Sequence, residues 1–429
     1  MHPNALLDAA SELVRLTLRF EHPADAVVSH FFRDQRQSRG GHSFGPRERA
    51  TLTDTVYNVL RHKLRLEHLA PSGSGPKERR MAILGFAAPR DFLKSALSDA
   101  EKHWLDQCDA VRPADLLERH RHNLPEWLVE PLKQQLGAQF WPLVESLDAP
   151  APLDLRVNTL TGKRDEVQKE MAKVSIHSEP TPYSPWGLRV EGKPSLAKLD
   201  VFIRGAIEVQ DEGSQLLALL VDAKRGEMVV DFCAGAGGKT LAIGAAMRNT
   251  GRLYAFDTSA HRLASLKPRL ARSGLSNVHP VAIAHERDDR IKRLAGKIDR
   301  VLVDAPCSGL GTLRLNPDLK WRQSPSGVAA MAQLQGAILA SAARLLKPGG
   351  RLVYATCSLL PAENEEVAQA FSAAQPDFAP LAAGDLLAEL KIDGVAALCS
   401  GPKSGLEYLR LWPHRHQTDG FFAAIWQRK

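Results

Sequence analysis

The feature that most constrains the fold is a regular alternation of strand-like and helix-like segments that begins near residue 206. Strand-like, mainly apolar runs occur at 228–232, 252–256, 278–283, 299–303, 350–356, 406–411 and 421–426. Helical patterns lie between them, starting near 239, 261 and 328. Alternating strands and helices are typical of a parallel sheet with helices on both faces. The sequence therefore predicts an α/β fold, a doubly wound Rossmann-like sheet, over residues 206–429.

Two smaller regions precede this sheet. Residues 1–147 repeat apolar side chains at helical spacing, which predicts an all-helical domain. A stretch with two prolines at 149–152 then marks a change of composition. The following residues have strand signals and one helix, which indicates a small RRM-like α/β module; the strands are expected at 154–158, 186–190 and 200–203, and the helix at 163–173. We therefore expect three domains, at 1–147, 150–205 and 206–429.

The composition is that of a globular chain with a moderate excess of basic residues. Of 429 residues, 44% are hydrophobic and 24% are charged, and 56 Lys and Arg against 49 Asp and Glu give a net charge of +7. This excess suits a polyanionic partner such as nucleic acid, although it also serves solubility. Arginines recur in residues 1–147, where they predict either a solvated helical surface or contacts with phosphate groups.

Several classes of protein are disfavoured by simple features of the chain. The N-terminus carries Asp8 and Glu12 inside its apolar pattern, so it predicts an amphipathic helix instead of a secretory signal. No apolar run reaches the roughly 18 residues that a membrane span needs. Five cysteines without a Cys-x-x-Cys pair argue against a disulfide framework and against a zinc site. We expect a cytoplasmic monomer that binds no metal or membrane and keeps its thiols reduced.

Two cysteines directly follow two of the predicted strands. Asp304-Ala305-Pro306-Cys307-Ser308-Gly309 follows the strand at 299–303, and Cys357-Ser358 follows the strand at 350–356. Ligands of open α/β sheets bind at the carboxyl ends of the strands, and neighbouring strands lie roughly 5 Å apart. Both thiols would therefore face one pocket if the two strands are neighbours. A lone buried Cys is often only a small hydrophobe, but two that each end a strand and precede a serine favour a chemical role.

A glycine-rich loop joins the first strand of this sheet to its first helix. Its residues are Cys233, Ala234, Gly235, Ala236, Gly237, Gly238, Lys239 and Thr240. Such small residues allow the backbone to approach a ligand closely. A nucleotide-phosphate loop would need glycine where this chain has Cys233, and the dinucleotide motif would need it at Thr240. Both of those sites are therefore disfavoured.

Asp257 follows the second strand, where an acidic residue can hold the hydroxyl groups of a ribose. The alternative is that it caps the next helix, with Thr258 and Ser259 as competitors. A ribose-binding acid beside a loop without a phosphate cradle fits S-adenosylmethionine, which has a ribose but no phosphate.

These motifs resemble the RNA cytosine-C5 methyltransferases of the bacterial RsmB type and the nucleolar NOP type. The resemblance covers residues 150–429 and is carried by segments 233–240, 304–309, 316–321 and 355–358. It implies a class I methyltransferase fold, S-adenosylmethionine as cofactor and RNA as partner, with small-subunit ribosomal RNA favoured over tRNA. The helical N-terminus is similar in placement to the NusB-like, antiterminator-like RNA-binding domain of the bacterial type.

The resemblance also implies roles for individual residues. Cys357 is expected to add to C6 of the cytosine, Asp304 to bind the N3/N4 edge, and Cys307 to help remove the proton from C5. Residues 233–239, Asp257 and Asp304 are expected to contact the cofactor. The alternatives are a tRNA methyltransferase, a non-catalytic RNA-binding assembly factor on the same fold, and a methyltransferase with a small-molecule or protein substrate.

The chain departs from the family's pattern at two places. Ala236 stands where the cofactor loop usually has proline. The acidic residue expected after the third strand, near the adenine, has no clear counterpart, and His285, Glu286 and Asp288 are the candidates.

Overall fold

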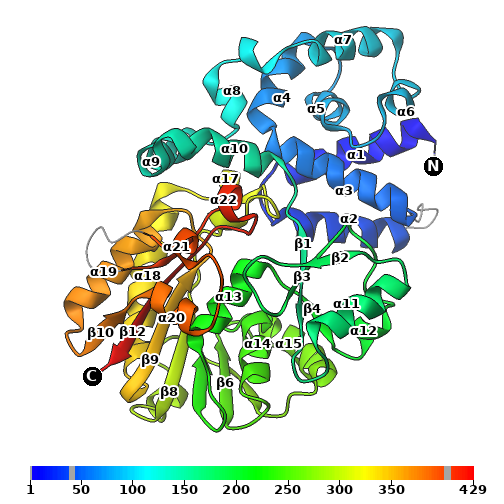
Figure 1. Cartoon of the computed structure of the whole chain (residues 1–429). Coiled ribbons are helices and arrows are strands. Elements are labelled where there is room, and N and C mark those ends of the chain that lie inside the picture. The colour runs from blue at the N-terminus through cyan, green and yellow to red at the C-terminus, as the bar shows by residue number, and fades with distance from the viewer. Residues whose placement is uncertain (1, 38–43, 401–406) are drawn as a thin grey trace. The chain divides into compact units, whose positions relative to one another are not determined.

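The computed structural model describes residues 2–37, 44–400 and 407–429, traced in Figure 1. The chain divides into two compact units. The helical unit consists of Met1–Pro150 and Leu313–Ser324, and the α/β unit consists of Ala151–Thr312 and Pro325–Lys429. The chain therefore passes between the two units three times. In the described ranges, no helix is both long and apolar enough to cross a membrane.

The helical unit confirms the predicted all-helical character of the N-terminal region. Its helices are α1 (Pro3–Thr17), α2 (Ala24–Gln37), α3 (Pro46–Arg61), α4 (Lys63–Leu69), α5 (Lys77–Gly85), α6 (Arg90–Lys94), α7 (Asp99–Asp109), α8 (Glu118–His122), α9 (Glu126–Leu136), α10 (Phe140–Asp148) and α17 (Leu319–Arg322). Leu7, Leu52 and Met81, from α1, α3 and α5, are fully buried in one apolar core. Burial of these amphipathic faces is the main source of stability for such short helices.

Residues 313–324 lie in the sequence between two parts of the α/β unit, but they pack among the N-terminal helices. Lys320 donates from Nζ to the carbonyl oxygen of Arg61 at 2.8 Å, and Trp321 donates from Nε1 to that of Leu60 at 2.8 Å. The carboxylate of Asp318 accepts from the backbone N–H of Ala24 at 3.2 Å. These bonds satisfy polar groups at the end of α3 and at the start of α2, so the segment is an integral part of the helical unit.

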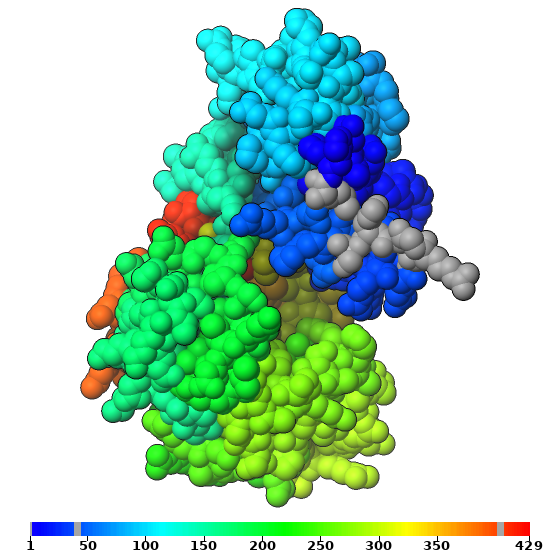
Figure 2. Space-filling view, turned by 90° about the vertical axis from the view of Figure 1, so that its right-hand side faces the viewer, coloured from blue at the N-terminus to red at the C-terminus, as the bar shows by residue number. Residues whose placement is uncertain are grey.

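The module that follows has a four-stranded antiparallel sheet in the order β2-β3-β1-β4. Its elements are β1 (Leu153–Val157), α11 (Arg164–Lys173), β2 (Ser178–Pro180), β3 (Gly187–Val190), α12 (Asp200–Ile203) and β4 (Ile207–Val209). Figure 2 shows this module, in turquoise to green, against the lime-green part of the same unit. Asn158 anchors the contact by donating from Nδ2 to the carbonyl oxygen of Ser273 at 3.0 Å.

One predicted strand of this module is wrong. Residues 200–203 form the short helix α12, in which the N–H of Arg204 donates to the carbonyl oxygen of Asp200 at 3.0 Å. Gly205 then takes a left-handed conformation with φ +72°, and the strand begins only at Ile207. A short apolar run such as 201–203 fits a buried helix turn as well as a strand, which explains the error.

The predicted doubly wound sheet is confirmed and has eight strands in the described part of the chain. These are β5 (Met228–Asp231), β6 (Arg252–Asp257), β7 (Val278–Ala282), β8 (Ile298–Asp304), β9 (Leu346–Thr356), β10 (Phe378–Leu381), β11 (Leu409–Leu411) and β12 (Phe421–Arg428). The order is β10-β12-β9-β8-β5-β6-β7, with β11 beside β12. Strands β5 to β9 pair in parallel, whereas β12 is antiparallel to β9, β10 and β11. Sequence analysis did not predict β10, and residue 406 of the predicted strand at 406–411 lies outside the described residues.

Helices accompany the sheet, as the alternation predicts. They are α13 (Glu212–Val221), α14 (Gly238–Ala246), α15 (Ala260–Ser273), α16 (Asp289–Lys292), α18 (Pro325–Ala343), α19 (Glu365–Ala374), α20 (Ala383–Glu389), α21 (Val395–Leu398) and α22 (Pro413–His416). Val229 belongs to one buried apolar cluster and its neighbour Val230 to another. Because successive side chains of a strand point to opposite faces, both faces of the sheet are buried, which accounts for its continuous apolar runs.

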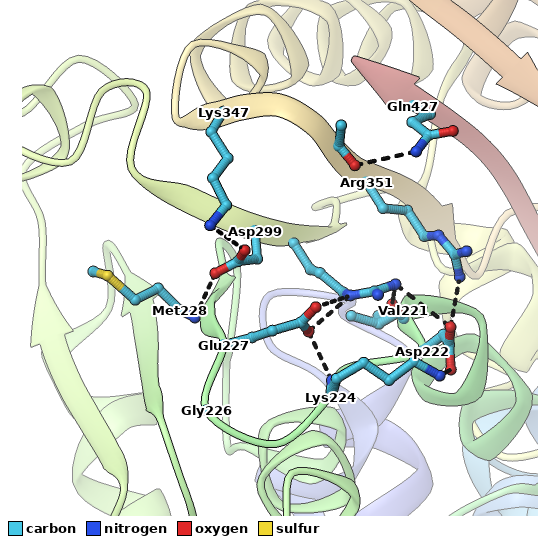
Figure 3. Close-up of polar contacts among 12 residues, drawn as sticks. Val221, Asp222, Lys224, Gly226, Glu227, Met228, Asp299, Lys347, Arg351 and Gln427 are labelled. Carbon is cyan, nitrogen blue, oxygen red and sulfur yellow. Dashed lines mark hydrogen bonds and ion pairs between the residues drawn. The ribbon is translucent and has the colours of Figure 1, made fainter. Parts of the chain in front are cut away.

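A network of ion pairs surrounds the edge of the sheet at which β5 begins (Figure 3). Asp222, just after α13, lies 3.6 Å from Arg300 and 3.5 Å from Arg351, measured from its Oδ2 to the nearest guanidinium nitrogen. Glu227 pairs with Arg300 at 2.8 Å, and Asp299 accepts from the N–H of Met228 at 2.8 Å. The cavity here, of about 140 Å³, is thus lined by charges that hold α13 to the strands. It lies at the end of the strands opposite to the cysteines.

Candidate active site

The two strand-ending thiols meet at the carboxyl edge of the sheet. Strands β8 and β9 are parallel neighbours, with Asp304 opposite Ala355. The Sγ atoms of Cys307 and Cys357 lie 3.4 Å apart. The expectation that both thiols face one place is therefore confirmed, because adjacent parallel strands carry their ends to the same edge.

Close backbone packing shapes the loop after Cys307. Gly309 has φ +73°, a conformation that glycine adopts without strain. Gly311 donates its N–H to the carbonyl oxygen of Cys357 at 2.8 Å and accepts from the N–H of Gly420 at 2.9 Å. A Cβ atom at Gly311 would lie only 2.0 Å from the carbonyl oxygen of Gly420. These glycines therefore let three chain segments meet behind the thiols.

Lys239 connects the glycine-rich loop to the cysteine motif. Its Nζ lies 2.8 Å from Oδ2 of Asp304, and it belongs to the first turn of α14. Burial alone would lower the pKa of Lys239, but the Asp304 carboxylate raises it above its ordinary value, with smaller contributions from Cys357 and Asp231. The ammonium group therefore stays charged beside the carboxylate, and Cys357 is among the groups with which it interacts.

The thiol of Cys307 tends to keep its proton. Its contact with Cys357, followed by burial and the negative charges of Cys357 and Glu363, raises the pKa of Cys307 well above the ordinary value of a thiol. In the free protein, Cys307 therefore remains protonated. A proton donor and a potential thiolate thus lie side by side at one strand edge, which suits chemistry that needs one nucleophile and one group to carry a proton.

The glycine-rich loop between β5 and α14 forms a tight cradle. Gly235 and Gly237 have φ +57° and +82°, and a Cβ at Gly237 would lie 2.1 Å from Cδ1 of Leu266. A Cβ at Gly238 would meet nothing closer than 3.7 Å. The loop therefore packs tightly against α15 and is less crowded at Gly238, where a Cβ would make ordinary contacts with Gln210 and Arg269. Burial, aided by nearby carboxylates, raises the pKa of Cys233 well above its ordinary value, so this loop thiol stays neutral.

Asp257 ties this loop to the end of β6. Its Oδ2 accepts from the N–H of Gly235 at 2.8 Å and its Oδ1 accepts from the N–H of Ser259 at 2.7 Å. Ser259 is the N-cap of α15, because its side chain accepts from the N–H of Arg262. The alternative that Asp257 caps this helix is therefore wrong, and its buried carboxylate lies beside the cradle.

Three residues after the third strand are candidates for the contact with the adenine, and one of them, Asp288, has a structural role. It caps α16 through the N–H of Arg290 at 2.9 Å and accepts from the N–H of Ala284 at 2.9 Å. His285 accepts from the N–H of Arg287 at 3.1 Å, and Glu286 pairs with the Arg287 guanidinium at 3.4 Å.

Within the described ranges, no group of three or more His, Cys, Asp or Glu side chains is arranged to hold a metal ion.

Sequence reasoning missed the pairing of Lys239 with Asp304. Lys239 is expected from the sequence to contact the cofactor, and Asp304 to contact both the cofactor and the base, but a bond between these two side chains is not predicted. The available signal was strand order, because a lysine at the start of the helix after β5 can reach the end of β8 only if these strands are neighbours. They are neighbours, with Asp231 opposite Leu302.

Asp231 provides a test of the electrostatics of this edge. Its Oδ2 accepts from the hydroxyl of Thr240 at 2.7 Å, and its Oδ1 is buried without a partner among the described residues. Burial raises the pKa of Asp231 to about 7, assisted by the charges of Asp304 and Asp257 and opposed by Thr240 and Lys239. A carboxyl group whose pKa is raised on folding stabilises the fold most at pH values below its ordinary pKa of 3.8. That contribution declines as the pH rises toward 7.

We therefore expect Asp231→Asn to become relatively more stable than the wild type as the pH rises. The difference in free energy of unfolding between the two proteins should change by on the order of 2 kcal/mol between pH 5 and pH 8. Urea unfolding followed by circular dichroism at several pH values measures it. Asp165→Asn, at an exposed position on α11, is the matched control and should give a flat profile. A flat profile for Asp231→Asn would contradict the raised pKa.

Comparisons with known proteins agree on one family. Residues 218–427 match the family described as 16S rRNA methyltransferase RsmB/F, and residues 124–197 match a ferredoxin-like domain of RsmF/B-like methyltransferases. A probable ribosomal RNA small subunit methyltransferase B of Synechocystis is 31% identical over 89% of this chain and 92% of its own length. Its counterpart from Bacillus subtilis is 31% identical over 81% of this chain and 76% of its own length.

Solved structures show the same fold along the chain. The crystal structure of PH0851 covers 100% of this chain and 99% of its own, with a TM-score of 0.77 and 27% identity. A methyltransferase homologue from Pyrococcus horikoshii covers 74% of this chain and 100% of its own, with a TM-score of 0.63 and 29% identity.

Proposed function

This chain belongs to the RsmB/F family of 16S rRNA methyltransferases, which depend on S-adenosylmethionine, and on that premise we propose that it methylates C5 of a cytosine in RNA. The proposal includes a covalent bond between Cys357 and C6 of the base. Its main support is the 3.4 Å separation of the Cys307 and Cys357 sulfurs beside the Lys239–Asp304 pair. Small-subunit ribosomal RNA is the proposed substrate, as it is the one named for the relatives.

The glycine-rich loop fits the proposed cofactor. We assign S-adenosylmethionine to the loop Cys233, Ala234, Gly235, Ala236, Gly237, Gly238 and Lys239, together with Asp257 and Asp304. The close-packed glycine backbone of this loop and the buried Asp257 carboxylate suit a ligand with a ribose and a cationic sulfur. When bound, this cofactor supplies an electrophilic methyl group.

The protein's task is to make C5 of cytosine a nucleophile, because this carbon is otherwise unreactive. The thiolate of Cys357 forms a bond to C6, and the electron pair of the C5–C6 double bond becomes available at C5. Asp304 accepts from the N4 amino group and supports a proton at N3, which balances the charge that develops in the ring. Lys239 supplies a positive charge that interacts with both Asp304 and Cys357.

The bond between the Cys357 sulfur and C6 prepares the later release of the base. Once the Cys357 sulfur is bonded to C6, it no longer hydrogen-bonds to Cys307 or carries a negative charge. Those are the first and third causes of the raised pKa of Cys307, so its pKa falls at this stage. Cys307 can then release its own proton to solvent and, as a thiolate, accept the proton from C5. The electron pair of the C5–H bond forms the C5–C6 double bond again, and the bond from C6 to Cys357 breaks to return the Cys357 thiolate.

The other regions would bind RNA. We propose that residues 1–147 serve as an auxiliary RNA-binding domain and residues 150–205 as a platform beside the catalytic domain at 206–429. The net charge of +7 supports a polyanionic partner. The target base must leave its stack to reach the thiols.

Bisulfite sequencing of total RNA from cells with and without the gene tests this function. We expect one cytosine of small-subunit ribosomal RNA to resist conversion only when the active gene is present. A plasmid that encodes the wild-type protein should restore the signal, whereas Cys357→Ala should not. Identical conversion maps in the two strains would contradict the proposed reaction, and a signal restored by Cys357→Ala would contradict the proposed nucleophile.

A further inference from the structure

One buried carboxylate joins the turns that carry the two thiols. Glu363 ends a short 3₁₀ turn (Pro361–Glu363) and is fully buried. Its Oε2 accepts from the hydroxyls of Ser308 and Ser358, each at 2.5 Å, and its Oε1 accepts from the N–H of Ser308 at 2.8 Å. Ser308 directly follows Cys307, and Ser358 directly follows Cys357. The side chain of Glu363 is therefore hydrogen-bonded to the serine that follows each of the two cysteines.

Two further side chains hold Glu363, one through its carboxylate and one through its main-chain carbonyl oxygen. Gln335 of α18 donates from Nε2 to Oε1 of Glu363 at 3.2 Å and to the carbonyl oxygen of Pro306 at 2.8 Å. The hydroxyl of Tyr354 lies 2.5 Å from the carbonyl oxygen of Glu363 and 3.1 Å from Oε1 of Gln335. Glu363 thus receives four hydrogen bonds to its carboxylate, which matches a group that only accepts. The arrangement leaves little freedom to either turn.

We propose that Glu363 is the positioning residue of the thiol pair: it holds the two sulfurs together, and its charge keeps the proton on Cys307 so that Cys357 is the sulfur free to attack. This inference rests on the function proposed above for the two cysteines. It assigns to Glu363 a part in the order of the reaction, in addition to its part in the fold.

The charged groups near the two thiols have the signs that this proposal requires. The negative charge of Glu363 is among the causes that raise the pKa of Cys307, after the contact with Cys357 and burial. Cys357, in contrast, interacts with the ammonium group of Lys239 and contributes to the raised pKa of that lysine. The thiol pair therefore lies between an anion that acts on Cys307 and a cation that acts on Cys357. This asymmetry favours one of the two possible thiolates.

The test compares Glu363→Gln with two other variants. Glu363→Gln keeps the shape and removes the charge, Glu363→Asp keeps the charge and shortens the reach, and Glu366→Gln changes an exposed carboxyl group on α19 as a control. Alkylation of the full-length protein by iodoacetamide, followed over pH by peptide mass spectrometry, gives a separate rate for Cys307 and Cys357. Steady-state methyl transfer to RNA gives kcat and KM for the same proteins.

In the wild type, Cys357 should be alkylated faster than Cys307 at neutral pH. Glu363→Gln should reduce this ratio by about tenfold, which corresponds to one unit of relative thiol pKa. It should also lower kcat by about 100-fold, while KM for the cofactor stays within twofold. The amide NH₂ cannot accept the hydrogen bonds that the carboxylate receives, so the two turns shift, and displaced reacting groups lose rate steeply. Glu363→Asp should retain the alkylation order but lose kcat, and Glu366→Gln should match the wild type in both assays.

A wild-type alkylation ratio in folded Glu363→Gln would overturn the proposal, even if kcat is reduced, because the residue would then be only structural. If this variant does not fold, as judged by its thermal melt, Ser358→Ala serves instead. Ser358→Ala removes the bond from Glu363 to the second turn, together with the contacts of the Ser358 hydroxyl with Ser308 Oγ and the N–H of Leu360. It should lower kcat with the alkylation order kept; an unchanged kcat would overturn the positioning role. Alkylation needs no methyl transfer, so failure of the proposed function appears separately, as activity in Cys357→Ala.

Discussion

Replacement of Cys357 by alanine will abolish methyl transfer to RNA while the protein still binds S-adenosylmethionine. The expected loss is at least about 1,000-fold, because removal of a covalent nucleophile eliminates the step that activates C5. The cofactor loop is expected to be unaffected, since Gly235 and Gly237 pack against α15 and not against Cys357. Transfer of a tritiated methyl group to RNA measures the activity, and calorimetric titration measures the affinity for the cofactor.

Cys108→Ala is a suitable control for loss of a thiol. Cys108 is buried in the apolar core of the helical unit and has no place in the proposed chemistry. This variant should retain most of its methyl transfer at a temperature where it is folded. If Cys357→Ala also retains a tenth or more of the wild-type rate, the nucleophile is another group.

Replacement of Cys307 by alanine will trap the protein on its RNA. In this variant Cys357 can still add to C6, but the thiol that lies 3.4 Å away and accepts the C5 proton is missing. The bond between protein and base should therefore persist after methyl transfer. Denaturing gel electrophoresis with labelled RNA should reveal a complex that survives detergent and heat, with at most one RNA per protein.

The double variant Cys307→Ala, Cys357→Ala is the decisive control for this experiment. It should give no detergent-resistant complex, because the attacking sulfur is also absent. Rapid turnover by Cys307→Ala without a trapped complex would remove Cys307 from the release step. A trapped complex in the double variant would show that the covalent bond involves a different residue.

Much of this site could be predicted because it depends on local patterns at strand ends. The runs at 299–303 and 350–356 contain consecutive apolar residues, as strands buried on both faces do, and each is followed directly by its motif. The convergence of Cys307 and Cys357 then followed from the geometry of neighbouring strands. The error at 200–203 has the same origin, because an apolar run too short for either period cannot distinguish a strand from a helical turn.

The bonds that unite the site could not be predicted in this way. Lys239 and Asp304 are 65 residues apart, and Ser308 and Glu363 are 55 residues apart. Each pair depends on which strands are neighbours and on where the following loop returns. Glu363 in particular resembles any acidic residue near a helix start, and only its complete burial against two serine hydroxyls distinguishes it.

From its sequence alone, this chain is an α/β protein with two thiols, an acidic residue and a glycine-rich loop at strand ends, because apolar periodicity and turn residues act over a few positions. Tertiary structure alone decided that β8 lies between β5 and β9, that Glu363 joins the two cysteine turns, and that segment 313–324 folds with the N-terminal helices. These features arise from contacts between distant parts of the chain. Burial makes such contacts favourable only after the whole sheet and its helices have assembled.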